Sequence, residues 1–412
     1  LLVIPPPYIL IPAIMRRRVT SAYELLERQL GAGGRQMGAI MFILLRLVWM
    51  SLLLYLTANA LVTVLGLSNE WTTAVAMIAG TVAILYTSMG GIRTVIVTDA
   101  IQFVLLLGGA LLTLIIVTAR MNGFDWWPTE WAANWDHQPF FSLDVHVRAT
   151  VVGSVISILI IQVATAGGDQ VAIQRYMSTN GPESARKAYL VKSVAQVFVF
   201  LILSSIGFGL LAFFQKFPAS LPPGIDVIRD ADQLFPLFIA EFLPAGFSGL
   251  VVVAIFAAAM SSIDSGVNSI SAVVQTDFID RYRQARSSKS GDPTGSKYLV
   301  AGTGLLVILL SHFMQFVPGN FLELTMKTAN ILVVPLFCLF IFALFVPFAT
   351  ASGAIIGAMV GFLTGLVVAY WDLITNSQAL SFQYIGISSL VANLVAGYAV
   401  SCLGARKICR KA

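Results

Sequence analysis

Charged side chains are scarce in this sequence: Asp, Glu, Lys and Arg together make up 11% of its 412 residues. A soluble domain carries about 25% charged residues because its surface faces water. The deficit runs along the whole length and excludes an ordinary soluble globular protein. The buried helical core of a large soluble protein is the one alternative to a membrane protein.

Several chemical signatures are also missing. The cysteines, Cys338, Cys402 and Cys409, have no metal-ligand spacing and give no disulfide framework. No phosphate-binding glycine loop, zinc spacing or Ser/His/Asp arrangement stands out, so we expect neither an enzyme nor a bound cofactor. The chain begins at Leu1 inside an apolar run, with no Met and no signal peptide, and we expect it to start within a longer protein.

Long apolar runs dominate what is present: 58% of the residues are hydrophobic and the mean hydropathy is +0.85. These runs do not alternate as the strands of a β-barrel do. The opening stretch 1–15 is short, and we expect it to end a further helix; we expect Gly90-Gly91 to end another. Runs long enough to cross about 30 Å of hydrocarbon occupy 38–66, 71–90, 97–118, 148–167, 188–214, 245–275, 298–316, 325–348, 353–371 and 382–403.

The pattern predicts an all-α fold, a polytopic transmembrane bundle of about 11 helices. We expect one transporter domain over 1–404 and a short basic cytoplasmic tail over 405–412. When the end of the first helix at Arg16 to Arg18 is taken as cytoplasmic, most Lys and Arg residues fall on the cytoplasmic side. The net charge of +5 therefore reports membrane sidedness and gives no hint of nucleic acid. Thr20 or Ser21 is expected to cap a helix on the cytoplasmic surface.

Acidic residues inside the spans are the first candidates for function, because an acid at a helix centre costs about 2.5–3.5 kcal/mol to insert and usually faces a partner or a wet cavity. Asp99 and Asp264 are such acids. Residues three or four apart share a helix face, so one cluster is Ala258, Ser261 and Ser262, and an overlapping one is Ser261, Asp264 and Ser265. Hydroxyl, carboxylate and carbonyl oxygens are the ligands of an alkali cation. Helix packing through small residues is the alternative.

A second candidate region is the interruption of an apolar run at Gly167-Gly168-Asp169. Discontinuous helices supply backbone groups to solute and ion in many transporters, and a plain loop start is the alternative. Glu323 and Lys327 are four residues apart and are expected to pair, with mutual neutralisation favoured over a solute contact. Arg46, also within a span, is expected to be structural.

Several motifs in order resemble the sodium:solute symporter family, which includes the sodium–glucose and sodium–sialic acid carriers. The likeness covers essentially the whole chain and is carried by Ser88-Met89-Gly90-Gly91, Thr98-Asp99-Ala100-Ile101-Gln102-Phe103, Asp169-Gln170, Gln174-Arg175-Tyr176, Ala258 to Ser262 and Asn268-Ser269. The resemblance implies an inverted repeat of two five-helix halves, with solute and sodium bound near the membrane midplane. It also implies that the family's first core helix, which supplies part of the sodium site, precedes residue 1.

The resemblance assigns roles to individual residues. Ala258, Ser261 and Ser262 match positions that hold the shared sodium, and Asp99 matches an acid tied to ion coupling. In relatives with a second sodium that acid joins hydroxyls at the positions of Ser261, Asp264 and Ser265, so Asp264 stands where a hydroxyl is expected. A second carboxylate strengthens cation binding, or one of the two acids stays protonated.

The sequence thus predicts a sodium-coupled symporter of a small organic solute, such as a sugar, sialic acid or carboxylate, working by alternating access in a cell membrane of the bacterial inner-membrane type. Its expected partners are sodium ion, the solute and the lipid bilayer, and we expect no obligate protein partner. Gln162, Thr165 and Lys327 are the candidates for solute contact. A membrane solute sensor with the same fold is the alternative, and a channel is a weaker third.

Overall fold

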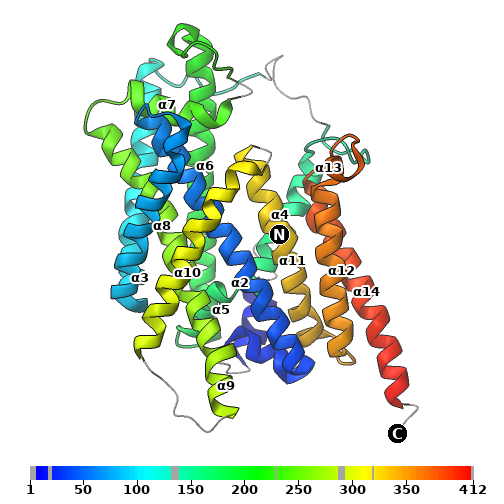
Figure 1. The fold of residues 1–412 in the computed structure, drawn as a ribbon. Helices are drawn as coiled ribbons and strands as arrows, with labels where there is room; N and C mark the ends of the chain where they lie inside the picture. Colours follow the sequence, from blue (N-terminus) through cyan, green and yellow to red (C-terminus); the bar gives the residue numbers. More distant parts are fainter. Residues whose placement is uncertain are drawn as a thin grey trace.

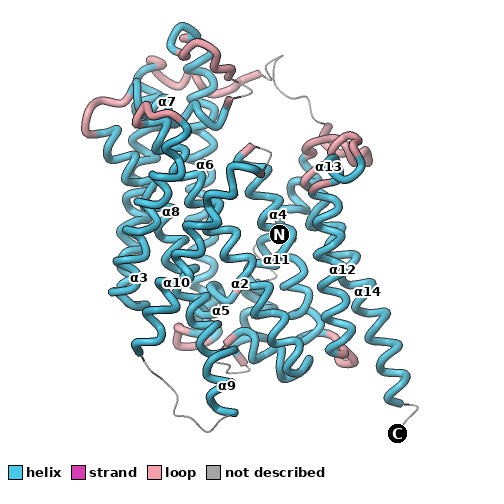
Figure 2. Tube along the Cα trace, in the orientation of Figure 1, coloured by secondary structure: helices cyan, strands magenta, loops and turns pink. Residues whose placement is uncertain are grey.

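The computed structural model describes residues 6–16, 21–130, 139–227, 230–285, 293–317 and 320–409, without the side chains of 89–96, 283–285, 293–296 and 405–409. Arg17, Arg18, Thr20 and the basic side chains of the expected tail lie outside what it describes. The described residues are almost entirely helical and contain no strand, and the loops gather at the two ends of the bundle (Figure 2).

The helices follow the apolar runs. The α-helices are α1 (Ile11–Met15), α2 (Ala22–Val64), α3 (Thr72–Arg120), α4 (Val151–Gly168), α5 (Gln170–Met177), α6 (Pro182–Lys216), α7 (Ala231–Phe242), α8 (Phe247–Val273), α9 (Asp280–Ala285), α10 (Pro293–Phe313), α11 (Phe321–Phe345), α12 (Ala351–Ala369), α13 (Trp371–Thr375) and α14 (Gln383–Cys409). In the described part of the chain, 10 candidate spans are long and apolar enough to cross a membrane, and Pro6–Met15 is a shorter apolar helix. Both findings agree with the prediction of about 11 helices.

The bundle has two sides joined by central helices. Figure 1 shows α3, α6, α7 and α8 on one side, α4, α11, α12 and α14 on the other, and α2 and α10 between them. Helix α11 lies at the centre of its side and packs on α2, α4, α12 and α14. In its most apolar 18-residue stretch, 72% of the residues are buried. Elements distant in sequence therefore meet around α2 and α11.

Helix α3 contains two of the candidate spans, up to Ser88 and from Val97, which we call its first and second arms (72–88 and 97–120). Helix α3 is one element through Gly90-Gly91, but its two apolar spans end at Ser88 and resume at Val97, on either side of the glycine pair where a helix end is expected. The two arms reverse direction. Thr87 and Asp99 would lie about 18 Å apart along a straight helix, yet they bond to residues one turn apart in α8.

Helix α2 also has two parts, separated by Gly31, whose φ of 67° lies in the left-handed region that favours glycine. The part before Gly31 begins with Ser21, which caps the helix by accepting from the backbone N–H of Tyr23 at 3.2 Å, as one of the two predicted caps. The longer part after Gly31 is the span. The short first part is the segment that the sequence places on the cytoplasmic surface.

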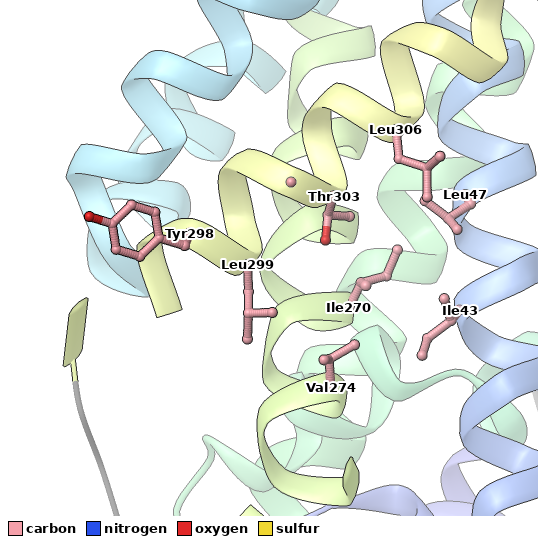
Figure 3. A pocket seen from close by; sticks show the side chains of 9 residues that line it. Ile43, Leu47, Ile270, Val274, Tyr298, Leu299, Thr303 and Leu306 are labelled. Carbon is pink, nitrogen blue, oxygen red and sulfur yellow. The ribbon is translucent and has the colours of Figure 1, made fainter. Parts of the chain in front are cut away.

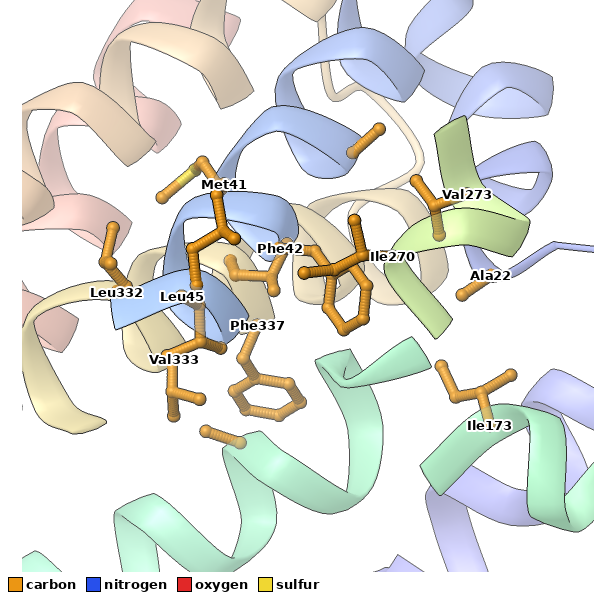
Figure 4. Close-up of a cluster of buried hydrophobic side chains, with 14 of the residues drawn as sticks. Ala22, Met41, Phe42, Leu45, Ile173, Ile270, Val273, Leu332, Val333 and Phe337 are labelled. Atoms are coloured by element: carbon orange, nitrogen blue, oxygen red, sulfur yellow. The ribbon is translucent and has the colours of Figure 1, made fainter. Parts of the chain in front are cut away.

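Apolar side chains close the centre of the bundle near the predicted cytoplasmic end. Figure 4 shows Met41, Phe42 and Leu45 of α2 facing Val333 and Phe337 of α11, with Ile270 and Val273 of α8 nearby. An open groove of about 270 Å³ runs beside this cluster, between α2, α8 and α10 (Figure 3). Its lining is apolar apart from Thr303 and Tyr298, so we do not assign it to ion binding.

A polar network lies at the same end. Asp277, which is 2% exposed, accepts from Arg35 at 2.5 Å and from the Ser21 hydroxyl at 3.1 Å. Glu27 pairs with Arg35 and with Arg281, each at 2.6 Å. These bonds join both parts of α2 to the segment that follows α8.

Candidate cation and solute site

Helix α8 carries most of the candidate cation ligands. Apart from Met260, its stretch from Ala257 to Ser262 consists of small residues, which let other helices approach closely. One turn further, Gly266 lies directly against Met50 of α2, with no room for a side chain. Asp264 is fully buried, whereas Ser261 and Ser262 are half-buried. The hydroxyls therefore face a partly open region rather than the packed core.

Asp99 meets α8 from the second arm of α3. The Ser261 hydroxyl donates to Asp99 Oδ1 at 2.6 Å, and the Arg175 guanidinium donates to Asp99 Oδ2 at 2.9 Å. The same Arg175 nitrogen lies 3.1 Å from the Ser265 hydroxyl. The structure thus brings three predicted residues together and adds Arg175, which the sequence marked only as part of a motif.

Asp264 meets the other arm of α3. Its Oδ1 accepts from the Thr87 hydroxyl at 2.6 Å, and its Oδ2 accepts from the Tyr86 hydroxyl. Its backbone carbonyl accepts from the Asn268 amide at 2.9 Å. Sequence reasoning missed Tyr86 and Thr87, because polar residues at the end of an apolar run ordinarily indicate the edge of the membrane.

The two carboxylates thus have different partners although they lie within about one turn of α8. Asp99 forms an ion pair with Arg175, whose side chain is 62% exposed. Asp264 instead accepts hydrogen bonds from neutral hydroxyl groups. Ala258 and Ser262 share the helix face that Ser261 presents. Carboxylate and hydroxyl oxygens with a backbone carbonyl form a hard-oxygen ligand set of the kind that takes an alkali cation in place of water.

The candidate solute residues lie on the neighbouring helices α4 and α11. Gln162 and Thr165 are half-buried on α4. Lys327 of α11 is 7% exposed, pairs with Glu323 at 2.8 Å and lies over the Tyr370 ring at 5.3 Å. The predicted Glu323–Lys327 pair is confirmed, and the charge of Lys327 is already balanced within its own helix.

The interruption between α4 and α5 is a true break in a helix. Helix α4 ends at Gly168, and Asp169 has extended backbone angles and caps α5 by accepting from the Val171 N–H at 3.0 Å. A Cβ on Gly168 would lie 3.0 Å from the Phe337 Cα, so only glycine lets α11 approach so closely. Asp169 also pairs with Arg46 of α2. The discontinuous helix, rather than the plain loop start, is what the structure shows.

Taken together, the apolar spans, the broken helix and the buried carboxylates beside hydroxyls define a polytopic helical membrane transporter. The chain belongs to the sodium:solute symporter family, whose model matches residues 7–361. This is a family of transporters and not of enzymes. The resemblance inferred from the sequence motifs is therefore confirmed.

The relatives transport different solutes. The chain is 26% identical to the sodium/sialic acid symporter SiaT of Proteus mirabilis over 95% of this chain and 77% of the relative. It is 28% identical to the sodium-dependent multivitamin transporter of Oryctolagus cuniculus, over 96% of this chain and 59% of that relative. It is 26% identical to the human sodium-coupled monocarboxylate transporter 1, over 87% of this chain and 58% of the relative.

The fold agrees with that of a solved sodium-coupled symporter. A structure described as the substrate-bound outward-open state of a Na+-coupled sialic acid symporter matches with a TM-score of 0.74 and 26% identity, covering 96% of this chain and 80% of the other. The predicted all-α transporter fold is therefore confirmed. The expectation that a first core helix precedes residue 1 stays a prediction.

Proposed function

We propose that this chain carries a small organic solute across a membrane together with sodium, by alternating access. The observation that carries the proposal is the contact between Ser261 of α8 and Asp99 of α3, which places a hydroxyl and a carboxylate in one spot inside lipid-embedded helices. An acid within a membrane span is costly to insert, and an acid at such a position ordinarily indicates a functional site. Family membership supports sodium as the coupling ion.

The proposed sodium ligands are the Ala258 carbonyl, the Ser261 and Ser262 hydroxyls and the Asp99 carboxylate. Asp264 and Ser265 extend this set on the same turns of α8. Sodium binding would favour an outward-open state that then accepts the solute, because a ligand shifts a conformational equilibrium by its difference in affinity between the two states. The membrane we propose is of the bacterial inner-membrane type.

The solute is proposed to lie between α4 and α11, near Gln162, Thr165 and Lys327. A carboxylate-bearing solute is favoured among sugars, sialic acids and carboxylates. This choice rests on the relatives, which include a sodium/sialic acid symporter and a sodium-coupled monocarboxylate transporter.

The test is uptake into proteoliposomes that contain the full-length protein. An inward sodium gradient should drive uptake, and a potassium gradient of the same size should not. Ser261→Ala and Ser262→Ala should each raise the sodium concentration needed for half-maximal uptake. Ser205→Ala, which removes an exposed hydroxyl bonded within its own helix α6, is the matched control and should leave that concentration unchanged.

Two results would contradict the proposal. Equal uptake under sodium and potassium gradients would refute the proposal of sodium coupling. An unchanged sodium requirement in both serine variants would refute the assignment of these serines to the sodium site, and sodium coupling itself would still stand.

A further inference from the structure

A buried ion pair lies where α4 gives way to α5. The Arg46 guanidinium of α2 donates to Asp169 Oδ2, while Asp169 Oδ1 caps α5 through Val171. Asp169 is 2% exposed and the Arg46 side chain is 16% exposed. The pair therefore fixes the broken helix against the span of α2 and leaves no net charge.

The bonding of this pair is incomplete on the side of the arginine. A guanidinium has five N–H donors, and the buried Nε of Arg46 has no acceptor among the described residues. The Arg46 guanidinium lies over the Phe42 ring at 5.9 Å, and the Tyr23 ring lies 5.8 Å from the same ring. Tyr23 is fully buried, and its hydroxyl likewise has no partner among the residues described.

Unused buried donors of this kind are unfavourable, because each has lost its water without gaining a bond. Lys327 offers a contrast, since Glu323 and the Tyr370 ring already surround its ammonium. Of these two basic side chains, Arg46 is the one with a buried nitrogen that has no acceptor among the described residues. Asp169 also shares a face of the α4 segment with Gln162 and Thr165, which are seven and four residues earlier.

We propose that Arg46 binds the carboxylate group of the transported solute at the α4–α5 break. This inference rests on the proposed function and names the group that the site recognises. Asp169 holds one edge of the guanidinium in place, and the edge that includes Nε receives the solute carboxylate. Arginine is suited to this role because its planar donors match a carboxylate in a bidentate way.

The charges balance in this arrangement. The Arg46–Asp169 pair is neutral, so a solute with one negative charge brings the site to −1. One co-transported sodium ion returns this site to zero, so that binding the acid adds no net charge at the α4–α5 break. The Tyr23 hydroxyl, against the same Phe42 ring, is a further donor for the solute.

The test compares acids with neutral analogues of the same shape in sodium-driven uptake by the full-length protein. The panel pairs lactate with lactamide and sialic acid with its methyl ester. The wild-type protein should take up at least one acid with a KM at least tenfold below that of its neutral analogue. Arg46→Gln should raise the KM for the acid at least tenfold and change that of the analogue less than threefold. Arg120→Gln, which removes an exposed cation, should alter neither value.

A second pair of variants separates solute binding from a purely structural ion pair. Arg46→Lys keeps the charge but loses the planar fork, so it should raise the KM for the acid while the protein melts at the wild-type temperature. The exchange Arg46→Asp with Asp169→Arg restores a pair of opposite charges. A structural role predicts that the exchanged protein recovers the wild-type KM for the acid, whereas the proposal predicts that it recovers only its melting temperature.

The outcomes separate this inference from the function on which it rests. An unchanged KM for the acid in Arg46→Lys overturns the inference, as does full recovery of that KM in the exchanged protein. Sodium-driven uptake of a neutral solute without uptake of any acid in the panel also overturns it and leaves sodium coupling intact. Uptake that does not depend on sodium in the wild-type protein overturns the proposed function itself.

Discussion

Replacing Asp99 by Asn tests the cation site most directly, because the change removes the negative charge and keeps the shape of the side chain. The carboxylate accepts from Ser261 at 2.6 Å and from Arg175 at 2.9 Å, and its side chain is 21% exposed. An Asn at this position still accepts from Ser261. The main loss is therefore the attraction between the carboxylate and a bound sodium ion.

The size of this loss follows from the surroundings of Asp99. Two unit charges at about 4 Å attract by about 1 kcal/mol in water and about 4 kcal/mol at an effective dielectric constant of about 20. Asp99 lies between these limits, and the 62% exposed Arg175 competes with the ion by about 0–1 kcal/mol. A net loss of about 1–3 kcal/mol raises the sodium concentration for half-maximal uptake by about 5-fold to 150-fold.

The assay is a sodium titration of uptake in proteoliposomes, with melting temperature as the check on folding. Asp125→Asn removes an exposed carboxylate from a loop and should leave the sodium requirement unchanged. A requirement within twofold of wild type in Asp99→Asn, with uptake retained, would refute the reasoning. The double variant with Ser261→Ala adds a second check, since residues that share one ion should give effects that do not add.

Two further predictions concern stability. Gly353→Ala should lower the melting temperature, at a cost of about 1–3 kcal/mol, because the new Cβ would lie against the Ser401 hydroxyl and 2.9 Å from the Gly397 carbonyl. Gly249→Ala is the control and should be neutral, because a Cβ there would enter open space. Equal melting temperatures for the two variants would contradict this prediction. Asp277→Asn should also lower the melting temperature, by less than the about 3–5 kcal/mol of a fully broken buried pair, because Arg35 keeps its bond to Glu27. Glu183→Gln, in an exposed pair with Lys187, is the control and should change little; a melting temperature for Asp277→Asn no lower than the control's would count against a structural role.

The spans could be predicted from the sequence because lipid imposes a simple rule on composition. The predicted run 245–275 and the helix α8 (Phe247–Val273) agree within two residues, and the break at Asp169 was visible as polar and glycine residues inside an apolar run. The expected helix end at Gly90-Gly91 lies in the stretch between Ser88 and Val97 where α3 turns back on itself. Local sequence signals the interruption, and only the packing of the arms decides its form.

The partners of the polar residues could not be predicted, because they come from distant parts of the chain. The chemistry of Asp264 was evident from its type and its span, yet nothing local pointed to Tyr86 and Thr87, which lie 178 and 177 residues away. Arg46 was interpreted as structural, and its pairing with Asp169 across 123 residues agrees with that reading without testing the role proposed above. Whether the assigned ligands bind sodium stays a prediction.

The reversal of α3 has a mechanical consequence. Each of its two arms forms a hydrogen bond to a neighbouring turn of α8, the first arm from Thr87 to Asp264 and the second arm between Asp99 and Ser261. Tilting α8 alone would break at least one of these hydrogen bonds to a carboxylate. During a transport cycle these two helices should therefore travel as a single lever, and the surfaces that slide must be sought where α8 faces the apolar side chains of α2.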